Sequence, residues 1–172
     1  MPWTPRLVDH RSPEVAAALM AVQRAAYRVE ADLIGYQAIP GLVEGPADIA
    51  ALDLTVLAVH EGDQGDPGDR HHHADRAVLG LVGYGRDGDV VDIDRLAVAP
   101  AAFRRGIGRA LVAAVHDREP DARAFTVSTG TDNAPAVALY TSLGYRPVGS
   151  SVLDGCPVTR FARERDRRNS QG

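Results

Sequence analysis

Residues 95–121 read RLAVAPAAFRRGIGRALVAAVHDREPD, an apolar extended segment that breaks at Pro100 and continues through two arginines and two glycines. From Ile107 onward, apolar residues follow at i+3, i+4, i+7 and i+8, which is the period of a helix that packs one face on a sheet. Proline and glycine interrupt the chain between the two periodic parts. The stretch therefore predicts a strand, a tight turn and a helix over about 106–118.

Strand-like and helical segments surround this stretch on both sides. Ser12 and Pro13 open a helix that the apolar spacing carries to about residue 30. The other expected elements are a short helix near the end of 35–52, strands at 5–11, 53–61, 77–88, 89–98 and 122–130, a helix at 132–145, a hairpin at 146–155 and 157–165, and a polar connection at 62–76. Because several adjacent strands precede a strand–helix–strand–helix run, we predict an α/β sandwich around a largely antiparallel sheet.

The composition excludes several classes of function. The chain has 172 residues, enough for one domain, and a formal net charge of −4, which does not favour nucleic acid as a partner. All 19 basic residues are arginine, so a lysine Schiff base or a lysine general base is excluded. Cys156 is the single cysteine, which rules out an intramolecular disulfide and a cysteine-based metal site. The sequence lacks a signal-peptide layout and an apolar run that could span a bilayer, so we expect a cytoplasmic protein with no membrane partner.

The glycine turn before the helix is a candidate phosphate site. Gly106 and Gly108 lie in the first helical turn, where backbone N–H groups lack intrahelical partners. Glycine there lets another molecule approach the backbone, and the helix dipole favours negative charge. Arg104, Arg105 and Arg109 add positive charge around the same end. The turn is either a phosphate or pyrophosphate cradle or a tight loop with solvated arginines.

Two common phosphate motifs do not fit this turn. The nucleoside-triphosphate loop requires a lysine, and the chain has none. The dinucleotide fingerprint requires a third glycine, and Leu111 stands at that position. The turn thus lacks residues that the chemistry of both motifs requires.

A second motif lies downstream, in DNAPAVALYTSLGY at 132–145, with Asn133, Ala136, Leu139, Tyr140, Gly144 and Tyr145 at its key positions. Together with RLAVAP and the glycine turn, it resembles the GNAT superfamily of acetyl-CoA-dependent N-acetyltransferases over residues 89–146. The resemblance implies a mixed, largely antiparallel twisted sheet with helices on both faces, in which a splayed strand pair holds the cofactor. It also implies a single N-acetyltransferase domain at 1–164, followed by a disordered tail at 165–172.

The resemblance further implies how acetyl-CoA is bound. The family's loop, Q/R-x-x-G-x-G/A, holds pyrophosphate mainly through backbone N–H groups; here Phe103 stands at the leading position, and Arg104 is a candidate substitute for the missing side-chain contact. A main-chain N–H near Ala97 or Val98 would polarise the acetyl carbonyl. The implied cofactor-binding residues are Leu96, Ala97, Val98, Phe103, Arg104, Arg105, Gly106, Ile107, Gly108, Arg109, Asn133, Ala136 and Tyr140.

Acetyl transfer to an amine needs an acid for the departing thiolate and a base for the amine. The resemblance implies that Tyr140 is the acid, and its alternative role is that of a core tyrosine with its hydroxyl at the edge.

The base is sought on the strand before the glycine turn. Strict alternation along 90–98 places Asp92, Asp94, Leu96 and Val98 on one face. The resemblance implies a base near the position of Asp92, where many family members have a glutamate; because aspartate is one methylene shorter, Asp92 is expected to act through a water, with Asp94 and His60 as rivals. The alternative for either aspartate is an ion pair with an arginine.

These observations predict an N-acetyltransferase that moves an acetyl group from acetyl-CoA to a primary amine, on a small molecule or a peptide N-terminus, by direct attack in a ternary complex. A non-catalytic acyl-CoA-binding sensor or interaction module, and a regulator that binds another nucleotide, are the alternatives. Four acidic residues of the first half are compatible with a cationic acceptor: Glu30, Asp32, Glu44 and Asp48. Dimerisation is common in the family, so a homodimer is one expected assembly.

No metal is expected. The three consecutive histidines at 71–73 do not converge on one ion in a strand or helix, and their flanks are typical of a solvated loop. Cys156 follows a turn and has no base beside it in the sequence, which gives little support to a nucleophile role.

Overall fold

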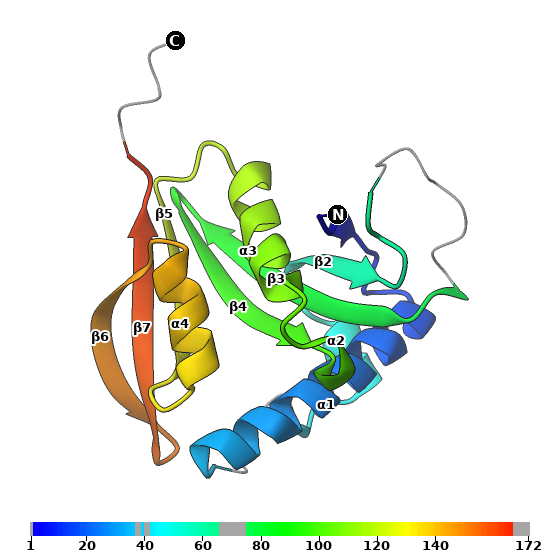
Figure 1. Ribbon diagram of the computed structural model, residues 1–172, viewed down its shortest axis with the longest axis horizontal. Helices are drawn as coiled ribbons and strands as arrows, with labels where there is room; N and C mark the ends of the chain where they lie inside the picture. The colour runs from blue at the N-terminus through cyan, green and yellow to red at the C-terminus, as the bar shows by residue number, and fades with distance from the viewer. Residues whose placement is uncertain (1, 37–38, 40–41, 66–74, 167–172) are drawn as a thin grey trace.

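The structure is a computed structural model that describes residues 2–36, 39, 42–65 and 75–166 (Figure 1). Its strands are β1 (Arg6–Leu7), β2 (Thr55–His60), β3 (Val78–Asp87), β4 (Val90–Val98), β5 (Ala124–Gly130), β6 (Arg146–Leu153) and β7 (Cys156–Glu164). Its helices are α1 (Pro13–Ile34), α2 (Pro46–Ala50), the 3-10 helix η3 (Pro100–Ala102), α3 (Ile107–Arg118) and α4 (Ala134–Ser142). The expected strands and α-helices are all present. The histidines at 71–73 and most of the expected tail lie outside the described residues.

The strands form one seven-stranded sheet in the order β1-β2-β3-β4-β5-β7-β6. β4 and β5 run parallel, and the other neighbouring pairs are antiparallel. This confirms the mixed, largely antiparallel sheet predicted from the order of the segments.

Helices cover both faces of the sheet, also as predicted (Figure 1). On one face, the buried side of α3 packs with Tyr140 of α4 against β2 to β5 in the larger apolar cluster. On the other face, Leu19 of α1 and Ile49 of α2 belong to a second cluster, which also contains Leu81 and Ala97. The sheet thus separates two apolar layers, and the candidate site lies where both layers end.

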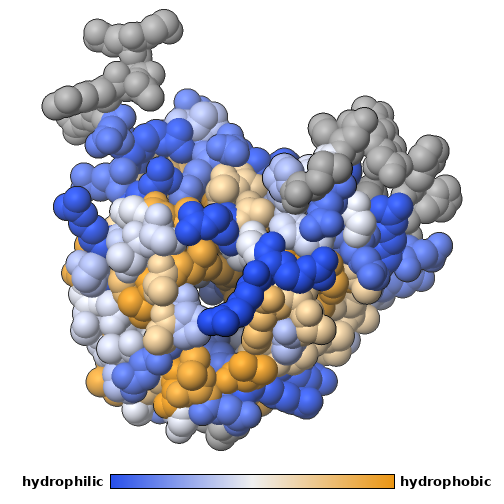
Figure 2. Space-filling model, in the orientation of Figure 1, coloured by the Kyte–Doolittle hydropathy of each residue, from blue (hydrophilic) through white to orange (hydrophobic). Residues whose placement is uncertain are grey.

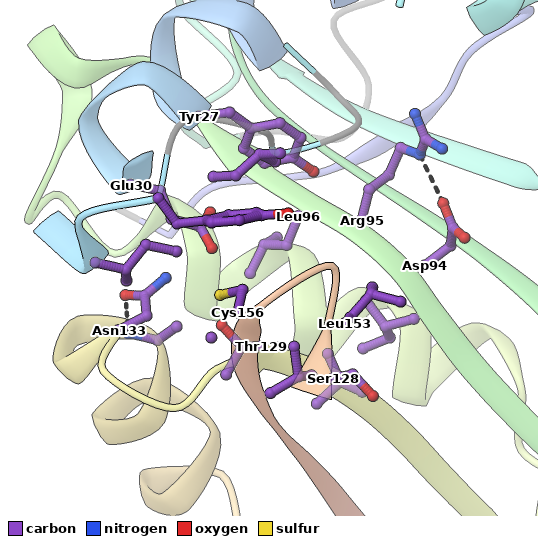
Figure 3. A pocket seen from close by; sticks show the side chains of 18 of the residues that line it. Tyr27, Glu30, Asp94, Arg95, Leu96, Ser128, Thr129, Asn133, Leu153 and Cys156 are labelled. Atoms are coloured by element: carbon purple, nitrogen blue, oxygen red, sulfur yellow. Dashed lines mark hydrogen bonds and ion pairs between the residues drawn. The ribbon is translucent and has the colours of Figure 1, made fainter. Parts of the chain in front are cut away.

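Helix α1 is longer than its apolar pattern indicated. It continues past the expected end near residue 30 to Ile34, and stops where Gly35 adopts a left-handed φ of 68°. The extra turn matters because it places Glu30 inside the helix, with its side chain directed toward β4 and α4 (Figure 3).

A β-bulge interrupts the alternation of β4. Ile93 pairs with Tyr84 and Arg95 pairs with Gly83, so Asp94 is the extra residue. Leu96 therefore packs with the same apolar cluster as Ile93, on the α3 and α4 face. The expectation that Asp92 shares a face with Leu96 and Val98 is wrong, because the bulge shifts the period-2 pattern by one residue.

β4 and β5 separate beyond their first four residues. They pair only from Val90 with Ala124 to Ile93 with Val127, although both strands continue. This agrees with the splayed pair that the resemblance implied, and it leaves the main chain of β4 after Ile93 free on the β5 side. A wedge-shaped space results between the two strand ends.

Candidate active site

Two adjoining cavities occupy this part of the molecule. The first, here called the wedge cavity, has a volume of about 440 Å³ and lies between α1, the ends of β4 and β5, and the β6–β7 turn (Figure 3). The second, here called the loop cavity, has a volume of about 500 Å³ and extends along β4 to the glycine turn. Figure 2 shows this face of the molecule hollowed near its centre, with apolar side chains beside the opening. Five residues line both cavities: Tyr27, Glu30, Leu96, Asn133 and Ala136.

The glycine turn has the backbone geometry of an open cradle. Arg104 and Gly106 adopt left-handed φ angles of 63° and 80°, and α3 begins directly after, at Ile107. A Cβ added to Gly106 would meet nothing within 4 Å, so the space over this backbone is open. The first N–H groups of α3 have no intrahelical partner and are available to an anion. The turn therefore fits the pyrophosphate of an acyl-CoA.

The three arginines of this turn have different surroundings. Arg104 and Arg109 line the loop cavity, and Arg109 donates a hydrogen bond from Nη2 to the Ser142 hydroxyl at 2.6 Å. Arg105 instead stacks over Trp3, with its guanidinium 4.9 Å from the ring centroid, while its carbonyl accepts a hydrogen bond from Trp3 Nε1. The position of Arg105 does not support its expected cofactor contact. The Arg105 side chain packs on Trp3, which is distant in sequence, and does not line the loop cavity.

Phe103, where the family pattern has Gln or Arg, is 42% exposed and lines the loop cavity. Val29 and Leu33 of α1 line the same cavity and are also exposed. At this position the cavity therefore has an apolar wall in place of a polar side chain.

The direction of the β4 amides is set by the pairing with β3. Ala99 donates its N–H to the carbonyl of Leu79 at 2.8 Å. Since amide direction alternates along a strand, the N–H of Ala97 also points to β3, whereas those of Leu96 and Val98 point into the wedge. Of the two amides expected to polarise the acetyl carbonyl, only that of Val98 faces the correct side.

Tyr140 lies at the inner wall of the wedge cavity and is 3% exposed. Its ring packs edge-on against Tyr145, with the centroids 5.5 Å apart. Burial raises the pKa of Tyr140 above its ordinary value, and the nearby Tyr27, Tyr145 and Glu30 raise it further. The hydroxyl therefore keeps its proton across the physiological range and can donate a hydrogen bond into the site.

Two of the three candidate bases lie elsewhere. The carboxylate of Asp92 accepts a hydrogen bond from the Thr126 hydroxyl and lies 3.5 Å from Arg160 Nη2, and Asp92 lines neither cavity. His60 is buried at the end of β2, with Nδ1 3.4 Å from the Asp63 carboxylate. The expected role of Asp92 is therefore not supported by its position, because the β4 bulge turns its side chain away from the wedge.

Asp94 lines the wedge cavity but is part of an ion-pair network. It accepts a hydrogen bond from Arg95 Nε at 2.7 Å (Figure 3). Arg95 Nη1 donates to Glu44 at 2.7 Å and to Gln23 at 3.1 Å. Gln23 Nε2 also donates to Glu44 at 2.8 Å. The network ties β4 to α1 and to the segment before α2, and it neutralises the one guanidinium among the described residues of this cavity.

Glu30 also lies in this site, although its sequence position indicated no more than a negative charge compatible with a cationic acceptor. Burial raises the pKa of its carboxyl group, and an interaction with the Asn133 side chain lowers it in part. Asn133 in turn caps α4, accepting a hydrogen bond from the Ala136 N–H at 3.3 Å. Asn133 was predicted from the downstream motif, but nothing in the local pattern of α1 shows that Glu30 reaches it.

Among the described residues, no group of three or more His, Cys, Asp or Glu side chains could hold a metal ion. Cys156 is buried, lines the wedge cavity, and has its Sγ 3.7 Å from the carbonyl of Pro157. In the part of the chain that the structure describes, no helix is both long and apolar enough to cross a membrane.

Several known proteins are similar to this chain in sequence or fold. Residues 67–147 match the family model described as an acetyltransferase (GNAT) domain. The UPF0157 protein YqkA of Bacillus subtilis (strain 168) is 35% identical over 139 residues, which are 81% of this chain and 37% of that protein. The chain thus spans little more than a third of the length of this curated relative.

Solved structures agree with the fold. The ribosomal-protein-S18-alanine N-acetyltransferase of Escherichia coli has a TM-score of 0.67 and 16% identity, covering 98% of this chain and 99% of that chain. The PaiA N-acetyltransferase of Thermoplasma acidophilum, in complex with coenzyme A, has a TM-score of 0.69 and 12% identity, covering 94% and 99%. With the family match over residues 67–147, the splayed β4–β5 pair and the open cradle before α3, the chain contains a GNAT acetyltransferase domain.

Proposed function

We propose that the protein transfers the acetyl group of acetyl-CoA to a primary amine by direct attack, with both substrates bound together. The observation that carries this is the junction of the two cavities. The loop cavity leads from the glycine turn along β4, and it meets the wedge cavity at Leu96 and Asn133. A thioester held along β4 would meet an acceptor there, and such positioning supplies a large part of the catalytic effect.

Different residues along the two cavities would bind the cofactor, stabilise the developing charge and supply a proton. The backbone of Gly106 to Arg109 would hold the pyrophosphate, and Arg104 and Arg109 add positive charge at the same cavity. The N–H of Val98 would stabilise the charge that develops on the acetyl oxygen. Tyr140 would donate its hydroxyl proton to the sulfur as the C–S bond breaks.

An enzyme is favoured over a binding module with the same fold because the wedge cavity is a second space that adjoins the loop cavity. A sensor that only binds an acyl-CoA has no use for a cavity of about 440 Å³ that begins beyond the acetyl position. Among the described residues, its lining includes four carboxylate side chains and a single arginine, which favours an amine over an anionic acceptor.

Two measurements test the proposal. Calorimetric titration should show micromolar binding of acetyl-CoA and of CoA, and much weaker binding of ADP. A thiol-release assay with acetyl-CoA and a panel of primary amines should then show amine-dependent formation of CoA. Binding without release for any amine would support the sensor, and binding of ADP in preference to CoA would support a nucleotide-binding regulator.

A further inference from the structure

Glu30 occupies the junction of the two cavities. It is the one carboxylate among the described residues that lines both of them. Among the residues that the structure describes, the loop cavity has no other acidic side chain, and the wedge cavity has Glu44, Asp94 and Asp154 at other positions. Figure 3 shows its carboxylate directed inward from α1, on the same side of the cavity as Asn133. Glu30 is therefore placed where the acceptor nitrogen must approach the acetyl carbon.

Two of the other three described carboxylates of the wedge cavity, Asp94 and Glu44, are bound to arginine, and the third, Asp154, follows β6 at the β6–β7 turn and does not line the loop cavity. Asp94 and Glu44 each lie 2.7 Å from Arg95, and Asp92 lies 3.5 Å from Arg160. Within the described residues, Glu30 forms no ion pair; the contact that acts on it is with the neutral side chain of Asn133. Glu30 is therefore the carboxylate at the junction that has no bound cation and can accept an ammonium group and its proton.

The groups around Glu30 favour a role as a proton-accepting base over a role as a carboxylate that stays charged and only binds the acceptor. The hydroxyl groups of Tyr27, on the same helix, and of Tyr140, on α4, interact electrostatically with the Glu30 carboxylate. Asn133 lies on the α4 side and contacts the same carboxylate. On the β4 side of the same cavity, the charge of Arg95 is balanced by Asp94 and Glu44. Burial raises the pKa of Glu30 above its ordinary value, which favours proton uptake by this carboxylate.

We infer that Glu30 binds the acceptor as an ammonium ion and removes its proton, so that α1 and not β4 supplies the base; this rests on the function proposed above. The ammonium gives one proton to Glu30, and the free amine adds to the acetyl carbon, forming the C–N bond. The C–S bond then breaks, and the sulfur takes the proton of Tyr140. The nitrogen loses its second proton, which restores Tyr140, while Glu30 releases the first proton to solvent. The products are the amide and CoA, with one proton released in total.

The same cavity limits the class of acceptor. Its lining carries Glu30, Glu44, Asp94 and Asp154, and Arg95 is engaged by two of these carboxylates. Among the described lining residues, a carboxylate beside the reacting nitrogen of an acceptor would find no free cation and would face four carboxylates, of which only Asp94 and Glu44 are paired with an arginine. The acceptor class is therefore a primary amine with no carboxylate next to the amine, on an apolar or cationic body.

The test compares amines in pairs that differ only in the α-carboxylate, tyramine with tyrosine and histamine with histidine. Thiol release is measured from pH 6 to 10 for the wild type, for Glu30→Gln, and for Glu14→Gln as the control. Glu14 lies on the same helix but is exposed in its first turn, away from both cavities. Acetyl-CoA affinity of each variant is measured by calorimetry.

The wild type should prefer the amine of each pair at least about tenfold in kcat/KM, as one unpaired charge implies. Glu30→Gln should lower kcat/KM at pH 7 by about a hundredfold, in the range of lost general-base catalysis. On the acidic side of its pH profile, the kcat/KM of Glu30→Gln should fall at a higher pH than that of the wild type, close to the pKa of the free amine. The reason is that only the neutral amine can react when the base is missing. Glu14→Gln should match the wild type, and acetyl-CoA affinity should stay unchanged in all three proteins.

If Glu30 had a purely structural role, its replacement would not shift the acidic side of the kcat/KM–pH profile. Wild-type activity and an unchanged pH profile in Glu30→Gln would overturn the assignment and leave the proposed function intact. Equal use of the amine and the amino acid in both pairs would overturn the acceptor class. Acetyl-CoA binding by the wild type with no turnover of any primary amine would mean that the proposed function fails, and the role of Glu30 with it.

Discussion

The ring nitrogen Nε2 of His116 lies 2.7 Å from the hydroxyl oxygen of Tyr145, deep between α3 and the end of α4. Arg163 approaches the other ring nitrogen, Nδ1, at 2.6 Å. A guanidinium can only donate, so Nδ1 accepts, and Nε2 carries the proton and donates to Tyr145. The neutral ring is therefore part of the native network, and a second proton on it would face Arg163 directly.

This arrangement predicts a loss of stability in acid. Burial, with help from Arg163 and Arg165, lowers the pKa of His116 to about 4 from an ordinary value near 6.5. Between these values the unfolded chain binds more protons, so the free energy of unfolding falls as the pH decreases from about 6.5 to 4, by at most about 3 kcal/mol. Urea unfolding at pH 7 and at pH 4.5 measures this decrease in the free energy of unfolding. The decrease should be smaller in the His116→Gln variant. An equal loss in the variant would show that other groups cause it.

Gly106→Glu should abolish acetyl-CoA binding. The new carboxylate would stand in the open cradle before α3, facing the place of the pyrophosphate, and should weaken affinity well beyond tenfold. Gly88→Glu is the matched control, because Gly88 also has a left-handed φ and open space but lies in the β3–β4 turn. Both variants should lose about 1 kcal/mol of stability from the backbone conformation. Equal affinities in calorimetry would exclude the turn as the pyrophosphate site.

Tyr140→Phe should lower kcat about a hundredfold without changing acetyl-CoA affinity, because it removes one hydroxyl proton and keeps the packed ring. Tyr145→Phe is the control, since its hydroxyl bonds to His116 outside both cavities. That change should cost about 1 kcal/mol of stability and leave kcat close to the wild type. Similar kcat values for the two variants would assign Tyr140 to the core alone.

Gly80→Ala should destabilise the protein, because the added Cβ would lie 2.8 Å from Ile107 Cγ2 and 3.1 Å from the Ala97 carbonyl oxygen. Relief of this contact would push α3 away from β3, with a cost of about 1–3 kcal/mol. Gly85→Ala on the same strand meets only Leu54 Cδ2, at 3.4 Å, and should be nearly neutral. Denaturant unfolding of both variants measures the difference, and equal midpoints would contradict the close packing of α3.

Local sequence alone determined most of the elements of this protein. Each helix and strand follows from apolar period, caps and turn residues within a few positions, as in the segment from Ile107 to Arg118. The cradle before α3 is equally local, because Gly106 and Gly108 act through their own backbone. Asn133 and Tyr140 were predicted for the same reason, from a motif within one helix.

The chemistry of the site was decided by contacts between distant segments. One extra residue at Asp94 shifts the faces of β4 and directs Asp92 out of the wedge, and alternation by itself does not predict a bulge. Arg105 contacts Trp3, which is more than a hundred positions away in the sequence, and so does not line the loop cavity. Glu30 reaches Asn133 only because α1 crosses the open end of the sheet (Figure 1). Caps and periods act over one or two turns of chain, whereas burial, ion pairs and the pKa of a carboxyl group depend on which surfaces meet when the chain is folded.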